Sequence, residues 1–146
     1  MNQILEHLWL GSFDDAEQAH VLPMPHIEML LTLCESPVGN TPLPMIHLPI
    51  PDEVFLPGHI WEERVQCLAH LLSRHTCTLV HCRVGVSRSP ALVAAYLAHG
   101  GMMPDVTTAL RYVMGRRSVV KVHEATFAGV EAWWNQRQQH QGEDAK

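Results

Sequence analysis

Nine consecutive residues, 81–89, bring a thiol, two guanidinium groups and two hydroxyls together around a glycine. Cys82 supplies a sulfur that is a nucleophile in its thiolate form. Arg88 supplies a planar fork of N–H donors that matches two oxygens of a phosphoryl group. Ser89 can donate a hydrogen bond to the sulfur when the sulfur leaves, and Gly85 lets the backbone curl tightly around an anion. These residue types at this spacing predict a reactive thiolate beside a binding site for an anion such as a phosphoryl group.

The elements on either side of this segment position its backbone as well as its side chains. Residues 78–81 are typical of a buried strand, and residues 91–98 are apolar throughout, which predicts an enclosed central helix. A tight turn between a strand and a helix N-terminus aims several backbone N–H groups at one point, which binds an anion. The same positive field stabilises a thiolate. We therefore expect the turn itself to hold the phosphate, through Arg83, Val84, Gly85, Val86, Ser87 and Arg88.

Strands and helices alternate along the rest of the chain. Apolar runs predict strands at 3–5, 8–10, 27–33, 45–48 and 78–81, and helical periodicity predicts helices at 14–20, 59–74, 91–98, 104–114 and 123–139. This alternation predicts an α/β fold with a central, mostly parallel sheet flanked by helices. Ligands bind beyond the carboxyl ends of parallel strands, so the site is expected among the loops after Leu33, Leu48 and His81.

Two of the predicted helices carry more detailed expectations. Pro104 suits the first helical position, where a missing N–H costs nothing. In the last helix, the spacing of Phe127, Val130 and Trp134 predicts that these three side chains face the core.

A phosphate ester also needs an acid for its leaving oxygen. Asp52 and Glu53 follow the strand that ends near Leu48. One right-handed strand, helix and strand crossover then returns the chain to Cys82 at the same sheet edge. Both carboxyl groups are candidates on this ground.

The pattern H-C-x5-R-S at 81–89 resembles the signature of the cysteine-dependent protein tyrosine phosphatases, and H-C-x-x-G-x-S-R-S is the variant of the dual-specificity subfamily. Further segments are similar to the opening strand and helix, the acid loop and the last three helices of that subfamily, namely 8–12 with 14–16, 48–52, 91–97, 109–117 and 127–134. The resemblance covers roughly the whole chain and implies a single phosphatase catalytic domain, 1–146, with residues 140–146 as a frayed tail. Two departures are Val84, where alanine is commoner, and 118–123, which lacks the usual Pro-Asn pair.

The resemblance implies a role for each of these residues. Cys82 takes the phosphoryl group as a cysteinyl-phosphate that water hydrolyses, and Arg88 binds the equatorial oxygens. Asp52 matches the position of the general acid and is preferred to Glu53 for that reason. The implied enzyme is metal-independent, uses no cofactor, and acts on phosphotyrosine and on phosphoserine or phosphothreonine in proteins.

Two alternatives stay open. One is a phosphatase for phosphoinositides or other non-protein phosphomonoesters, and Arg83 beside the nucleophile is the feature in its favour. The other is a pseudophosphatase module that binds phosphoproteins without turnover, although Cys82, Arg88, Ser89 and Asp52 are all present.

Three further positions have expected supporting roles. His81, at the end of a strand, is interpreted as a core histidine that braces the loop. Arg116 and Arg117 are interpreted as a helix-end pair that complements the helix dipole, in preference to a second anion contact. Cys34 follows the strand 27–33 as Cys82 follows 78–81, so it is either a packing residue or a thiol that resolves oxidised Cys82.

Composition bounds the class of protein. The 146 residues are 47% apolar and 17% charged, which is ordinary for one globular domain. A net charge of −5, with two lysines against eight arginines, argues against nucleic acid as a partner. The longest apolar run, 91–98, is too short to span a membrane, and residues 1–3 lack the basic start of a signal peptide. Four cysteines without C-x-x-C predict free thiols, and eleven histidines without metal spacing predict no metal site. The chain is expected to be a cytoplasmic monomer, and the resemblance implies a phosphoprotein substrate as its partner.

Overall fold

A five-stranded sheet forms the centre of the structure, a computed structural model that describes residues 1–144. Its order is β1-β2-β5-β3-β4, and the strands are β1 (Asn2–Leu5), β2 (Leu8–Gly11), β3 (Met29–Thr32), β4 (Met45–His47) and β5 (Thr78–His81). Only β1 is antiparallel to its neighbour; β2, β5, β3 and β4 run parallel. The predicted mostly parallel sheet is confirmed, and β5 lies in the middle of it.

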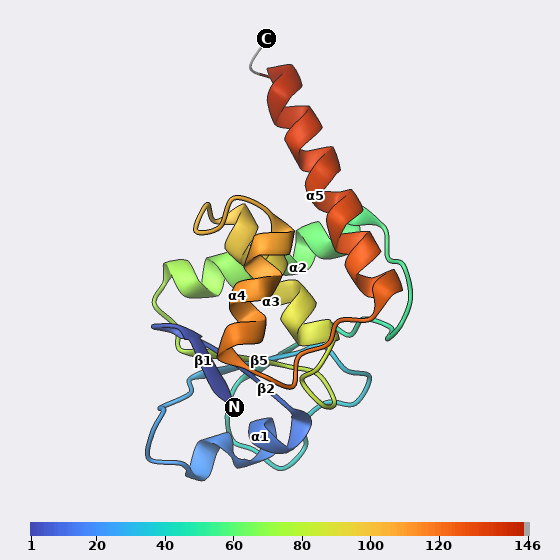
Figure 1. The fold of residues 1–146 in the computed structure, drawn as a ribbon. Helices are drawn as coiled ribbons and strands as arrows, with labels where there is room; N and C mark the ends of the chain where they lie inside the picture. The colour runs from blue at the N-terminus through green and yellow to red at the C-terminus, as the bar shows by residue number, and fades with distance from the viewer. Residues whose placement is uncertain (145–146) are drawn as a thin grey trace.

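Helices cover both faces of the sheet unequally. They are α1 (Phe13–Gln18) with the 3₁₀ turn Ala19–Val21, α2 (Gly58–Ser73), α3 (Arg88–His99), α4 (Val106–Arg116) and α5 (Glu124–Asp144). Figure 1 shows α2, α3, α4 and α5 gathered on one side of the sheet and α1 on the other. None of the helices within residues 1–144 has the length and apolarity needed to cross a membrane.

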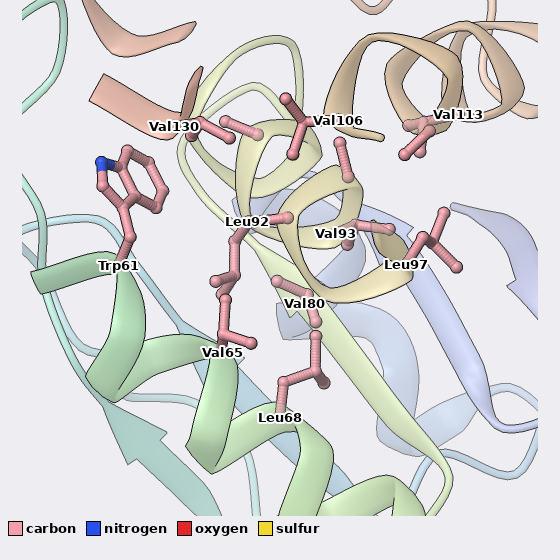
Figure 2. Close-up of a cluster of buried hydrophobic side chains, with 14 of the residues drawn as sticks. Trp61, Val65, Leu68, Val80, Leu92, Val93, Leu97, Val106, Val113 and Val130 are labelled. Atoms are coloured by element: carbon pink, nitrogen blue, oxygen red, sulfur yellow. The ribbon is translucent and has the colours of Figure 1, made fainter. Parts of the chain in front are cut away.

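The core is built around α3, as the unbroken apolar run predicts. Every residue from Arg88 to Ala98 is buried except Tyr96, which is half-buried. The sheet closes one side of this helix, and α2, α4 and α5 close the others. Figure 2 shows α3 side chains packed among those of β5, α2, α4 and α5, with Trp61, Val80, Val106 and Val130 among the contacts. The first turn of α3, which begins at Arg88, is therefore held rigidly against the sheet.

The start of α4 differs from the prediction by two residues. Val106 is the first helical residue, and the preceding Asp105 caps the helix. The Thr108 N–H donates to Asp105 Oδ1 at 2.7 Å, which satisfies one of the free amides of the first turn. The prediction that Pro104 occupies N1 was wrong because a stronger capping residue follows the proline.

The inward face of α5 also differs. Thr126, Val130 and Trp133 are buried, whereas Phe127 and Trp134 are half-buried at the margins of the core. The prediction of Val130 is confirmed, and Trp133 takes the place expected for Trp134, one residue away in helical phase. The helix continues to Asp144, so residues 140–144 of the predicted frayed tail are helical. Residues 145–146 of that tail lie outside the described residues.

Candidate active site

The β5–α3 loop (residues 82–87) turns its carbonyl groups outward. The acceptors and their donors are Arg83 O with Phe13 N–H (3.0 Å), Val84 O and Gly85 O with Arg117 (3.2 and 3.0 Å), Val86 O with Lys121 N–H (2.9 Å), and Ser87 O with Ala91 N–H (3.0 Å). The C=O and N–H of a peptide group point in opposite directions. The N–H groups of 84–88 therefore point inward, which is the arrangement that an anion-binding loop requires.

Gly85 is the one position of this loop that requires glycine. Its φ is +76°, in the left-handed region. A Cβ there would lie 2.5 Å from the carbonyl oxygen of Gly11, which belongs to the backbone of β2. The loop can curl this tightly because a hydrogen atom is the only side chain that fits against β2.

Cys82 lies at the base of a cavity of about 420 Å³. Its sulfur is 3.2 Å from the hydroxyl oxygen of Ser89, and both side chains are buried. Three segments line the cavity, namely the β5–α3 loop with Arg88, residues 52–53, and residues 121–124. The predicted nucleophile and its predicted hydrogen-bond donor are thus adjacent at the bottom of an open pocket.

Arg88, the first residue of α3, links two other loops to this pocket. Its Nη1 donates to Glu35 Oε1 at 2.8 Å and to Ile50 O at 3.3 Å. Its Nε is 3.8 Å from Asp52 Oδ1. A hydrogen bond to the backbone of Glu35, together with the charge of Arg88, lowers the pKa of the Glu35 carboxyl group. The guanidinium is therefore the meeting point of the loops after β3, β4 and β5.

Asp52 and Glu53 both line the cavity from the β4–α2 loop (residues 48–57). Asp52 Oδ1 also accepts a hydrogen bond from the Glu53 N–H at 3.0 Å, and Glu53 adopts a φ of +58°. Of the two carboxyl groups, Asp52 is the one paired with Arg88. Buried Arg64 of α2 holds the start of this loop by donating to Pro49 O (2.9 Å) and Leu48 O (3.4 Å), contacts that no sequence pattern indicated.

His81 braces the β5–α3 loop from below. It is fully buried, its Nδ1 lies 3.2 Å from Cys82 O, and its Nε2 lies 2.7 Å from Thr32 Oγ1. A carbonyl only accepts, so the proton is on Nδ1 and Nε2 accepts from the Thr32 hydroxyl. Burial lowers the pKa of His81 to about 4, which keeps the ring neutral in this arrangement. The expected backbone partner is present, and the threonine on β3 is an additional one.

Arg117 lies at the end of α4, as predicted, and it also contacts the β5–α3 loop, which the sequence did not indicate. It caps α4, but its guanidinium donates to Gly85 O and Val84 O, and its Nη1 donates to Asn2 Oδ1 at 2.8 Å. Arg116 points elsewhere and donates to Gln3 O at 2.9 Å. The pair was interpreted as a helix-end feature because a sequence does not show which loop lies beside a helix end.

Arg83 and Cys34 lie at the edge of the site. Arg83 is exposed, stacks over Phe13 at 4.7 Å and donates to Ser36 Oγ at 3.2 Å. Cys34 is buried, its thiol donates to Ser36 O at 3.4 Å, and burial raises its pKa. Residues 1–144 contain no group of three or more His, Cys, Asp or Glu side chains placed to hold a metal ion.

Comparison with known proteins relates this geometry to a family. The family described as "Dual specificity phosphatase, catalytic domain" matches residues 8–134. Human dual specificity protein phosphatase 14 is 33% identical over 124 residues, which cover 82% of this chain and 61% of that protein. Rat dual specificity protein phosphatase 5 is 32% identical over 122 residues, or 81% of this chain and 31% of that protein. This chain thus spans less than two thirds of these relatives.

The fold is also similar to that of a solved dual specificity phosphatase structure. The crystal structure of human DUSP28 superposes with a TM-score of 0.85 at 18% sequence identity, covering 96% of this chain and 99% of that chain. At this level of identity the likeness concerns the fold, a mixed sheet flanked by helices. It agrees with the predicted α/β architecture.

Proposed function

Because the chain belongs to the dual specificity phosphatase family, we propose that it hydrolyses phosphotyrosine, and phosphoserine or phosphothreonine, in proteins through a cysteinyl-phosphate intermediate. The observation that carries this proposal is the 3.2 Å contact between Cys82 Sγ and Ser89 Oγ at the base of a cavity that Arg88 and Asp52 also line. Nucleophile, leaving-group stabiliser, anion binder and acid share one pocket.

In the first half of the reaction the Cys82 thiolate attacks phosphorus. An S–P bond forms and the bond from phosphorus to the substrate oxygen breaks. Asp52 gives its proton to that oxygen, which leaves as a hydroxyl group. The N–H groups of the β5–α3 loop and the Arg88 guanidinium neutralise the charge that spreads over the three equatorial oxygens.

In the second half water replaces sulfur. The Asp52 carboxylate accepts a proton from water as its oxygen bonds to phosphorus, and the S–P bond breaks to release inorganic phosphate. The Ser89 hydroxyl, 3.2 Å from the sulfur, donates a hydrogen bond to the departing thiolate. Each proton that Asp52 gives is thus returned, and no metal or cofactor enters the cycle.

The charges that line the cavity support a protein substrate. Three of the lining side chains are acidic and three are basic, namely Asp52, Glu53, Glu124, Arg83, Arg88 and Lys121. A lining of mixed charge disfavours an inositol headgroup with several phosphates, which would select an excess of cations. A phosphoinositide phosphatase stays the second candidate because two cations, Arg83 and Lys121, also line the cavity.

The decisive test is hydrolysis of p-nitrophenyl phosphate and of phosphopeptides in the presence of a chelator. Wild-type protein should release phosphate, and Cys82→Ser should bind inorganic phosphate but release none, because a serine hydroxyl without a base is a poor nucleophile. Activity above about one percent in Cys82→Ser would contradict the covalent role. Faster turnover of phosphoinositides than of phosphopeptides would favour the second candidate, and absence of turnover in wild type would favour the pseudophosphatase.

A further inference from the structure

An exposed acid is bonded to the buried arginine of the pocket. Glu35, in the loop after β3, has a side chain that is 64% exposed, and Arg88 has one that is only 5% exposed. Their atoms Oε1 and Nη1 are 2.8 Å apart. The pair thus joins a buried cation of the pocket to a carboxylate that solvent reaches.

The contact uses one particular nitrogen of the guanidinium. Among the described residues, Glu35 and the Ile50 carbonyl both accept from Nη1, and Nε faces Asp52 without a hydrogen bond, at 3.8 Å. A guanidinium presents Nε and its far Nη as two parallel donors that match two oxygens of a phosphoryl group. The bonds at Nη1 therefore hold the side chain by the nitrogen outside this fork.

We propose that Glu35 is a positioning residue that fixes the Arg88 guanidinium so that its Nε and Nη2 donors face the phosphoryl oxygens; this inference rests on the proposed function of the same site. The Ile50 contact is long, at 3.3 Å, and it involves the same nitrogen. One carbonyl at that distance is a weak restraint on the terminal torsion of the side chain. Glu35 adds the short, charge-assisted bond that fixes it.

The opposite role for Glu35 is competition with phosphate for Arg88. Competition requires the carboxylate to occupy the donors that phosphate uses, whereas Glu35 occupies Nη1. Its negative charge faces water over most of its surface, so solvent and salt screen its repulsion of the phosphate. Positioning and competition predict changes of opposite sign when the carboxylate is removed.

The test measures binding of inorganic phosphate by calorimetry in a Cys82→Ser background, where no turnover interferes. Glu35→Ala should weaken phosphate binding about tenfold, the value of one charge-assisted hydrogen bond. Glu35→Gln keeps an amide oxygen at the same reach for Nη1 but loses the charge, so it should weaken phosphate binding less than Glu35→Ala does, about threefold. Glu131→Ala, which removes an exposed glutamate of α5 away from the pocket, is the matched control and should change nothing.

The same variants with Cys82 intact separate positioning from a general loss of structure. Glu35→Ala should lower kcat as well as raise KM for an aryl phosphate, with an unchanged melting temperature and with partial rescue by Glu35→Gln. Unchanged or tighter phosphate binding in Glu35→Ala, or equal losses in Glu35→Ala and Glu35→Gln, would overturn the proposal. A wild-type protein without turnover would refute the proposed function, yet the comparison of phosphate binding would still decide the role of Glu35.

Discussion

Arg117 Nε and the carbonyl oxygen of Gly85 are 3.0 Å apart, although they belong to the end of α4 and to the β5–α3 loop. The same guanidinium reaches Val84 O and, on its other side, Asn2 of β1. Arg117 thus links two outward-facing carbonyls of the loop to the edge of the sheet. We expect this contact to help hold the neighbouring N–H groups in their inward direction.

Replacement of Arg117 by glutamine should loosen the loop without removing any group that touches substrate. We expect kcat/KM for an aryl phosphate to fall roughly 10- to 100-fold, the effect of a small misplacement transmitted to reacting groups. Arg116→Gln is the matched control, because Arg116 also bonds to β1 but does not contact the loop. Similar losses in both variants would show that the end of α4, and not the contact with the loop, is what matters.

A comparison of Gly85 with Gly101 separates two effects of replacing a glycine, namely a steric clash with β2 and the strain of a left-handed backbone. Both have left-handed φ values, +76° and +78°, but a Cβ would meet Gly11 O at 2.5 Å only at Gly85 and meets nothing within 4 Å at Gly101. Gly101→Ala should cost about 1 kcal/mol of unfolding free energy from φ alone. Gly85→Ala should cost more and should abolish phosphate binding, measured by denaturant unfolding and calorimetry. Equal costs and retained phosphate binding would refute the steric role.

The parts of the site that are contiguous in sequence were predictable. The run from Cys82 to Ser89 carries its own geometry, because the strand before it, the glycine within it and the helix after it force the turn and aim its N–H groups. The sheet edge that collects the loops after β3, β4 and β5 follows from parallel strands alone. For the same reason, the candidates for the general acid could be narrowed to two residues, Asp52 and Glu53.

The supporting contacts were not predictable, because each depends on packing between distant elements. Glu35 and Arg88 are 53 positions apart, and Arg117 and Gly85 are 32 apart. No local pattern marks either pair. The choice of Trp133 over Trp134 as the buried tryptophan is similar, since one step of helical phase is decided by how α5 packs on α2, where Trp133 Nε1 donates to Glu62 at 3.3 Å.

Protonation of His81 should destabilise the fold at mildly acidic pH. The pKa of the buried ring is lowered from 6.5 to about 4, so as pH falls below 6.5 the unfolded chain binds a proton that the folded chain does not. Stability is therefore full above pH 6.5 and decreases towards pH 4, by about 3 kcal/mol in total from this residue. Chemical unfolding across that range should show a shallower pH dependence in His81→Gln and an unchanged one in the control His20→Gln, whose histidine is exposed. An imidazole that titrates near 6.5 by NMR would contradict this account.

Removal of the Asp52 carboxyl group should affect poor leaving groups most. We expect Asp52→Asn to lower kcat roughly 10²- to 10⁴-fold for phenyl phosphate, and less for p-nitrophenyl phosphate, whose leaving group departs with little protonation. Glu53→Gln is the matched control, because Glu53 lines the same cavity but is not paired with Arg88. The assignment is wrong if Glu53→Gln shows the dependence on leaving group and Asp52→Asn does not.

Cys34 should protect Cys82 from irreversible oxidation. Thr32 and His81 are paired at the ends of the neighbouring strands β3 and β5. Cys34 lies two residues after the end of β3, and Cys82 lies one residue after the end of β5. Peroxide converts the Cys82 thiolate to a sulfenic acid with release of hydroxide, and the Cys34 thiol can then form a disulfide with loss of water. The thiol must leave its hydrogen bond to Ser36 O to do so.

Wild-type activity lost to hydrogen peroxide should therefore return on treatment with dithiothreitol. Cys34→Ser should lose this recovery, because sulfenic acid without a nearby thiol proceeds to sulfinic acid, which thiols do not reduce. Cys77→Ser is the matched control: Cys77 precedes β5, which places it roughly 16 Å from Cys82 along the strand at about 3.3 Å per residue. Mass spectrometry should find a bridge between Cys34 and Cys82 in the wild type and in Cys77→Ser. Equal recovery in Cys34→Ser would leave Cys34 with a packing role only.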